Sequence, residues 1–142
     1  MSDPSCVLQV CVSCKRARAA DGEDRAEPAA SDAPEGRQLH DALLDAIGAD
    51  PALASGVTLQ AVECMSNCDH SCTVALRADD KFSFVLGALD ASPERVEDIV
   101  TFTSRYLEAD KGLPAWRERP VHIRKNTIAR LHPAPLPRTS QD

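Results

Sequence analysis

Aromatic residues and long apolar runs are scarce in this chain of 142 residues. Aromatics make up 4% of it, so the hydrophobic core must consist mainly of Leu, Val, Ile and Ala. No run approaches the roughly 20 apolar residues of a membrane span, and no basic start followed by an apolar stretch indicates a signal peptide. Basic residues are in the minority, 16 against 22 acidic ones. The resulting net charge of −6 argues against nucleic acid or an anionic membrane as the main partner, and we expect a soluble, cytoplasmic protein.

Cysteine, by contrast, is plentiful, with six residues, five of them in two short clusters. The first is the CxxC formed by Cys11 and Cys14, and in the second Cys64, Cys68 and Cys72 recur at every fourth position. In a reducing cytosol such cysteines indicate metal or redox work rather than a disulfide framework. A CxxC paired with a CxxxC, each following a predicted strand, favours ligation by four thiolates around one metal ion or a two-iron cluster.

Other residues near the clusters have weaker claims to a role. Cys6 lies inside an apolar run and is expected to be a small buried hydrophobe. His70 is expected to face water and is the weaker of two additional ligand candidates. The other, Cys72, begins a predicted strand, and a four-ligand site leaves it over, so we predict that it packs rather than ligates. Ser13, Ser66, Asn67 and Ser71 offer hydroxyl and amide donors to the sulfur atoms.

Hydrophobic patterning predicts strands and helices in alternation, with a loop insert at 19–36 that lacks periodicity. Asp50 and Ser92 are expected to cap helices, since each precedes a proline that suits a first helical position. The predicted elements are a strand at 6–10, a helix at 36–48, a helical turn at 51–54, strands at 57–62, 72–77 and 82–86, and a helix at 93–110.

The predicted order of strand, helix, strand, hairpin and helix is that of a thioredoxin-like α/β fold, β-α-β-β-β-α. In that topology the end of the first strand and the loop after the second, parallel strand lie at the same end of the sheet. Both cysteine clusters are therefore expected to converge. We assign this domain to residues 5–113.

Residues 114–142 differ in character and are predicted to form a basic arm. They hold six Lys or Arg against two acidic residues, and five prolines. Apolar residues between 121 and 131 suit a short helix or an extended segment packed on the body, with Trp116 as the expected anchor. The positive charge is that of either a solvated tail or a docking surface for an acidic partner.

Four stretches carry a resemblance to a known family. They are CVSCKR at 11–16, ECMSNCDHSCTVAL at 63–76, FSFVLGALD at 82–90 and LPAWRERPVHIRKNTIARLHP at 113–133. They resemble a bacterial family of predicted metal-binding proteins of unknown function. The wider similarity is to thioredoxin-like [2Fe–2S] ferredoxins, which implies a cluster held by the positions of Cys11, Cys14, Cys64 and Cys68.

Three functions remain open at this point. The favoured one is a [2Fe–2S] protein for electron transfer or an accessory redox role, not an enzyme. The first alternative is a protein that binds zinc or another thiophilic metal for structure or delivery. It rests on the two-residue spacing between Cys11 and Cys14, which zinc knuckles also use and which is tighter than in the ferredoxins. The second alternative, a dithiol oxidoreductase, is disfavoured because this CxxC runs into a charged loop instead of a helix. The sequence names no redox or metal-transfer partner, and it leaves a homodimer open.

Overall fold

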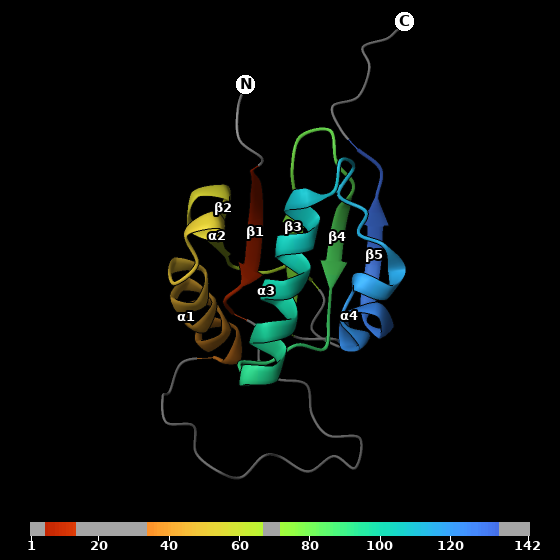
Figure 1. Ribbon diagram of the computed structural model, residues 1–142. Coiled ribbons are helices and arrows are strands. Elements are labelled where there is room, and N and C mark those ends of the chain that lie inside the picture. Colours follow the sequence, from red (N-terminus) through yellow and green to blue (C-terminus); the bar gives the residue numbers. More distant parts are fainter. Residues whose placement is uncertain (1–4, 14–33, 67–71, 134–142) are drawn as a thin grey trace, which may run out of the picture.

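The computed structural model describes residues 5–13, 34–66 and 72–133 (Figure 1). The predicted strands and helices are confirmed, with boundaries within two residues of those expected. The elements are β1 (Cys6–Cys11), α1 (Glu35–Gly48), α2 (Pro51–Gly56), β2 (Val57–Val62), β3 (Val74–Arg77), β4 (Ser83–Leu86), α3 (Pro93–Glu108), a 3-10 turn (Trp116–Glu118), α4 (Val121–Lys125) and β5 (Thr127–Leu131).

The described strands form one five-stranded sheet in the order β2-β1-β3-β4-β5. β1 and β2 are parallel, while the β1–β3, β3–β4 and β4–β5 pairs are antiparallel. The parallel pair requires a crossover, which α1 supplies by packing on β1 and against α3. In Figure 1 α3 lies across the front of the sheet. This is the predicted β-α-β-β-β-α arrangement with one strand added.

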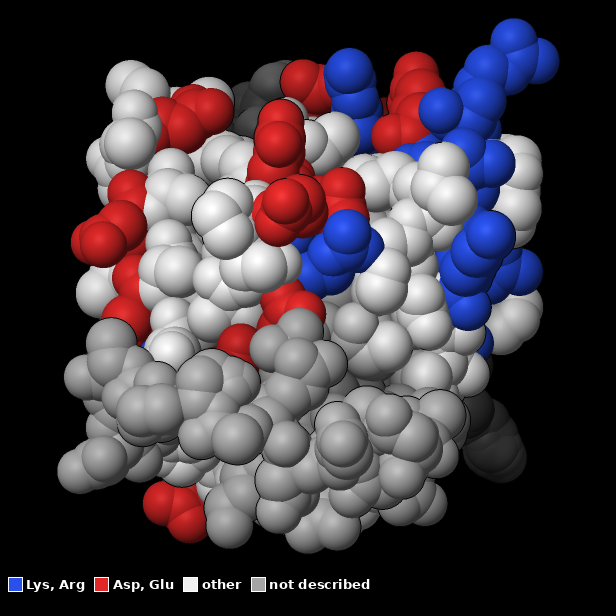
Figure 2. Space-filling view, turned by 90° about the horizontal axis from the view of Figure 1, so that it is seen from below, with Lys and Arg blue, Asp and Glu red and all other residues white. Residues whose placement is uncertain are grey.

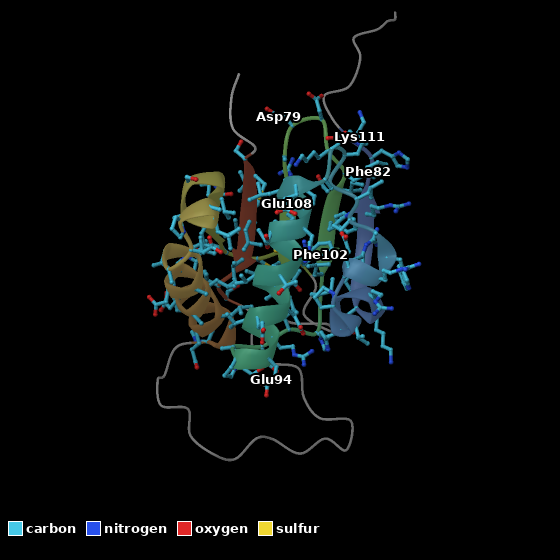
Figure 3. The ribbon with its side chains drawn as sticks, in the orientation of Figure 1. Asp79, Phe82, Glu94, Phe102, Glu108 and Lys111 are labelled. Carbon is cyan, nitrogen blue, oxygen red and sulfur yellow. The ribbon has the colours of Figure 1, made fainter. Side chains whose placement is uncertain are left out.

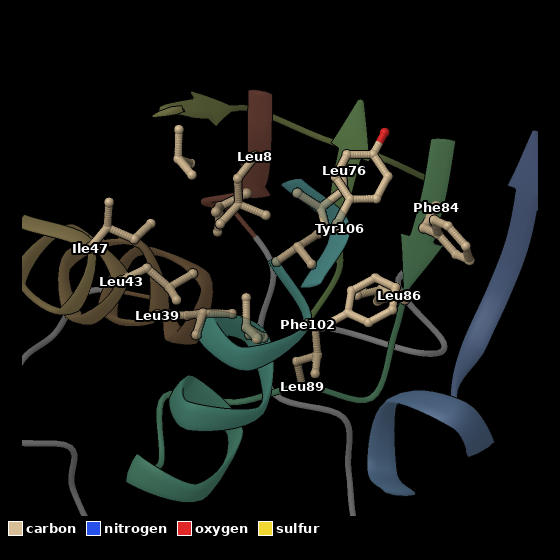
Figure 4. Packing of buried hydrophobic residues seen from close by; sticks show 14 of the residues in the cluster. Leu8, Leu39, Leu43, Ile47, Leu76, Phe84, Leu86, Leu89, Phe102 and Tyr106 are labelled. Atoms are coloured by element: carbon tan, nitrogen blue, oxygen red, sulfur yellow. The ribbon is translucent and has the colours of Figure 1, made fainter. Parts of the chain in front are cut away.

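The core lies between the sheet and this helical layer (Figure 4). Leu8 and Val10 of β1 are fully buried because alternate residues of the strand point to the helices. Phe84 is the centre of an aromatic group, with its ring 5.2 Å from that of Phe102 and 6.1 Å from that of Tyr106, both edge-on. Such edge-to-face contacts are the favoured geometry for aromatic pairs. Three of the five aromatic residues of the chain thus lie where α3 meets the sheet.

Both predicted helix caps are confirmed. The Asp50 carboxylate accepts hydrogen bonds from the amides of Ala52 (3.0 Å) and Leu53 (3.4 Å) at the start of α2. The Ser92 hydroxyl accepts one from the amide of Arg95 (3.3 Å) at the start of α3. Each cap satisfies amides that have no partner within the helix.

The basic arm is partly built into the fold. Both expected forms occur: α4 is a short helix and β5 is an extended segment. β5 pairs with β4 as an edge strand of the sheet. The expected anchor was wrong, because Trp116 is 61% exposed while Ile123 of α4 is fully buried. Within the part of the chain that the structure describes, no helix is long and apolar enough to cross a membrane.

Candidate metal centre

Cys11 and Cys64 lie at the same end of the sheet. Cys11 is the last residue of β1, and the parallel register places it opposite Val62, the last residue of β2. Cys64 follows two residues later, and the sulfur of Cys11 lies 3.8 Å from the carbonyl oxygen of Glu63. The topology therefore brings together one cysteine from each cluster. Cys14, Cys68 and His70 lie outside the described residues.

Backbone hydrogen bonds from two neighbouring strands fix the position of Cys11. Its amide donates to the carbonyl of Thr73 (3.1 Å), at the entry to β3, and the next amide, of Val12, donates to the carbonyl of Val62 (2.9 Å). The Ser13 hydroxyl lies 3.7 Å from the Cys11 sulfur and donates to the carbonyl of Glu63. The thiol is buried, at 2% exposure, so its orientation is set by packing as well as by these bonds.

Cys64 is exposed and has a local amide donor. The backbone N–H of Ser66 donates to its sulfur at 3.3 Å. Ser66 adopts a φ of +56°, in the left-handed region that non-glycine residues rarely occupy. Such a conformation costs on the order of 1–3 kcal/mol. Asp80 and Ala88 adopt it as well. N–H···S bonds stabilise thiolates and tune the potential of iron–sulfur centres, so this turn is suited to a ligating cysteine.

Cys72 is fully buried at the back of the same loop. Its amide and carbonyl pair with the carbonyl (2.8 Å) and amide (3.1 Å) of Leu89, and its side chain belongs to the hydrophobic core. The burial we expected is confirmed. Its predicted non-ligand role remains a prediction.

Cys6 lies at the other end of β1 from Cys11. It is 3% exposed, as expected for a small core residue, and burial raises the pKa of its thiol to about 11, although the charge of Lys81 acts in the opposite direction. A neutral thiol in this position contributes packing and is a natural control for the cysteines of the centre.

The donor set suits a thiophilic metal. Two of the four predicted ligands, Cys11 and Cys64, are described, and within the described ranges no three His, Cys, Asp or Glu side chains gather as a metal site. Thiolates select iron–sulfur clusters, zinc and similar ions over hard cations. Sequence reasoning missed the backbone carbonyls of Glu63 and Thr73, which help to position Cys11, because backbone groups have no residue-type signature.

The sheet order and the helical layer define a thioredoxin-like fold, with Cys11 and Cys64 at one end of its sheet. A thioredoxin-like [2Fe–2S] ferredoxin from Aquifex aeolicus is similar over 91% of this chain and 94% of its own, with a TM-score of 0.54 and 20% identity. A second structure, of the wild-type ferredoxin, gives a TM-score of 0.53 at 17% identity, covering 90% of this chain and 99% of the other. A variant with one cysteine replaced by serine gives 0.52 at 19%, covering 87% and 98%. At these identities the likeness establishes the fold.

The chain belongs to the family described as "Protein of unknown function (DUF1636)", whose profile matches residues 8–134. The predicted resemblance to an uncharacterised family and to thioredoxin-like ferredoxins is thereby confirmed. No curated protein matches the chain.

Proposed function

We propose that this protein binds a [2Fe–2S] cluster through Cys11, Cys14, Cys64 and Cys68 and serves in electron transfer or an accessory redox role, with no substrate chemistry of its own. The observation that carries the proposal is that Cys11 ends β1 while Cys64 lies two residues beyond the end of the parallel neighbour β2, at the same end of the sheet. Each brings a second cysteine of its cluster within a few residues along the chain. Two short loops thereby supply four thiolates.

When bound, such a cluster supplies one-electron redox chemistry, and this chain's own residues hold it and tune it. The Ser66 amide donates to the Cys64 sulfur and the Ser13 hydroxyl lies beside the Cys11 sulfur. Hydrogen bonds to the ligating sulfurs and burial of the centre are the protein's means of setting a reduction potential. The solved structures that share the fold include proteins named [2Fe–2S] ferredoxins, which supports iron over other metals.

Two alternatives are weighed by particular features. Zinc is favoured by the spacing of two residues, Val12 and Ser13, between the first cysteines. A dithiol oxidoreductase is disfavoured by the placement of Cys11. Cys11 ends the strand β1, and the first helix among the described residues begins at Glu35, whereas a dithiol enzyme of this fold lowers the pKa of its thiol with a helix N-terminus at the CxxC.

The test is the metal content and visible absorption of the protein purified without oxygen. We expect a red-brown protein with iron and labile sulfide in equal amounts, about two of each per chain. Cys11→Ser and Cys64→Ser should each lose most of the iron, because each removes a ligand from a different loop. Cys6→Ser is the matched control and should retain the iron.

Two results would contradict the proposal. A colourless protein with one zinc per chain would establish the first alternative. Loss of iron in Cys6→Ser, without loss in Cys11→Ser, would show that the ligands are not those at the C-terminal ends of β1 and β2.

A further inference from the structure

Basic residues are concentrated on the arm around α4, and two of them, Arg119 and Arg124, lie over the ring of the chain's one tryptophan. Trp116 is 61% exposed, and Val121 at the start of α4 is 54% exposed. We call the surface they share with the neighbouring basic side chains the basic face. Its basic residues are Arg117, Arg119, Arg124, Lys125 and Arg130.

Contacts within the arm fix part of this surface in place. The guanidinium groups of Arg119 and Arg124 lie 5.7 and 5.4 Å from the centre of the Trp116 ring. Each is also held through Nε, Arg119 by the carbonyl of Pro114 (2.9 Å) and Arg124 by the carbonyl of Arg119 (3.0 Å). The arrangement is therefore ordered before any partner binds, which lowers the entropic cost of binding.

The basic residues of the basic face form no ion pair within the described part of the chain, although the acidic Glu118 lies between Arg117 and Arg119. Among the described residues, the ion pairs between Arg and carboxylates are Arg95–Asp98 and Arg105–Glu108, both on α3, and none involves the basic face. The pKa of Arg119 is lowered, first by burial and then by the charge of Arg130. Like charges thus lie close together at some cost in stability, which is a reason to seek a role for them in binding.

The charge is also segregated across the molecule. Residues 114–142 carry six basic and two acidic residues, a net charge of +4. The net charge of the whole chain is −6, so the remaining residues carry −10. Seen from the end of the sheet where β1 finishes, Lys and Arg gather at the side of α4 and β5, while acidic residues dominate elsewhere (Figure 2). Nitrogen-tipped side chains project outward along α4 and β5 (Figure 3).

The basic face is linked to the cysteine end of the sheet by hydrogen bonds. His122 of α4 donates through Nε2 to the carbonyl of Ala88 (2.8 Å). The next residue, Leu89, pairs with Cys72, and the residue after Cys72, Thr73, accepts from the amide of Cys11. α4 is therefore hydrogen-bonded to the segment that supports the candidate centre.

We propose that the basic face is the docking surface for an acidic protein partner. Exposed Trp and Arg are the residue types most enriched at energetically important positions of protein interfaces. Opposite charges steer the encounter of two proteins and raise its rate. A protein is favoured over nucleic acid or a membrane because the −10 on the rest of the chain repels an extended polyanion, whereas a compact acidic patch meets the basic face alone. The proposal concerns binding and holds whichever metal the cysteines take.

Trp116 provides a direct probe, because it is the only tryptophan in the chain. We would titrate the purified protein with a short, Trp-free peptide rich in Glu with interspersed Leu, and follow Trp116 emission. Binding should shift the emission to shorter wavelength as the ring leaves water. The affinity should fall at least tenfold between about 20 mM and 500 mM salt, because the Debye length shortens from about 20 Å to about 4 Å.

Charge reversals locate the binding surface. Arg117→Glu with Lys125→Glu should weaken binding at least tenfold. The matched control, Arg37→Glu with Arg77→Glu, changes the net charge equally on α1 and at the end of β3 and should stay within twofold. Circular dichroism and the iron content of each variant separate a loss of docking from a loss of fold or metal.

Two outcomes would overturn the proposal. One is equal weakening in both double variants, which would show a general charge effect. The other is tighter binding of a DNA duplex or of vesicles containing phosphatidylserine than of the peptide, which would make the partner a nucleic acid or a membrane.

Discussion

Ile123→Ala tests whether the arm is part of the folded domain. Ile123 is the one fully buried residue of α4, and this helix of five residues is too short to be stable by itself. Its position therefore depends on this side chain and on the neighbouring strand β5. Cation–π contact between Arg119 and the Phe84 ring, at 5.6 Å, adds a second attachment nearby.

The expected cost follows from burial. The substitution removes three buried carbon atoms, worth about 0.8 kcal/mol each in transfer from water, or roughly 2.4 kcal/mol. The cavity left behind adds to this, and measured Ile→Ala changes in cores lie at about 2–5 kcal/mol. We therefore expect a loss of about 3 kcal/mol, a large part of the roughly 5–15 kcal/mol by which domains are stable.

Urea unfolding followed by circular dichroism measures this loss, with Val121→Ala as the control. Val121 is on the same helix and 54% exposed, so its truncation should change the free energy of unfolding by less than about 0.5 kcal/mol. Because Val and Ile have similar helix propensities, the difference between the two variants isolates packing. A loss below about 1 kcal/mol in Ile123→Ala, or equal losses in both, would show that the arm is not packed as described.

Three further predictions concern the cysteines and the metal. Cys72→Ala should keep iron and visible absorption and lose about 1 kcal/mol, as for a small core truncation, whereas a bleached protein would make Cys72 a ligand. Since the pKa of Cys6 is raised to about 11 from 9.0, the unfolded chain releases this proton first as the pH rises. The free energy of unfolding should therefore fall between about pH 9 and 11, and a fall just as steep in Cys6→Ala would assign the effect to other groups. Removing the metal should lower the urea midpoint, with a loss of up to several kcal/mol in the free energy of unfolding, because structural metal sites supply roughly 10 kcal/mol of apparent binding free energy. Superimposable unfolding curves with and without metal would contradict this coupling.

The elements that bury a continuous face were predictable from the sequence. Alternation in 57–62 and the apolar run at 6–10 gave β2 and β1, and the caps at Asp50 and Ser92 located two helix starts. On α3, Val96 and Val100 pack against the core but stay partly exposed, whereas Phe102 is fully buried. Phe102 packs edge-on against Phe84 of β4, a contact distant in sequence that no local pattern states.

The strand β5 was not identified as a strand because it has the burial pattern of an edge. Ile128 and Leu131 are 43% and 57% exposed, so no alternation of buried and exposed residues distinguishes a strand from an extended arm. What orders β5 is pairing with β4, which is a contact distant in sequence. The convergence of Cys11 and Cys64 was predictable for the opposite reason, since a β-α-β unit places the two strand ends side by side by topology alone.

The added strand also relates the arm to the candidate centre. β4 is followed at once by Gly87, whose amide donates to the carbonyl of Asn126 (2.9 Å) between α4 and β5, and by Leu89, which pairs with Cys72. The same short segment thus holds the arm on one side and the support of the cysteine loop on the other. Loosening of the loop by metal loss should reach the arm through this segment, and Trp116 emission should report it. A change in that emission on metal removal would show that the arm and the centre are coupled. Unchanged emission would show that the arm and the centre are independent.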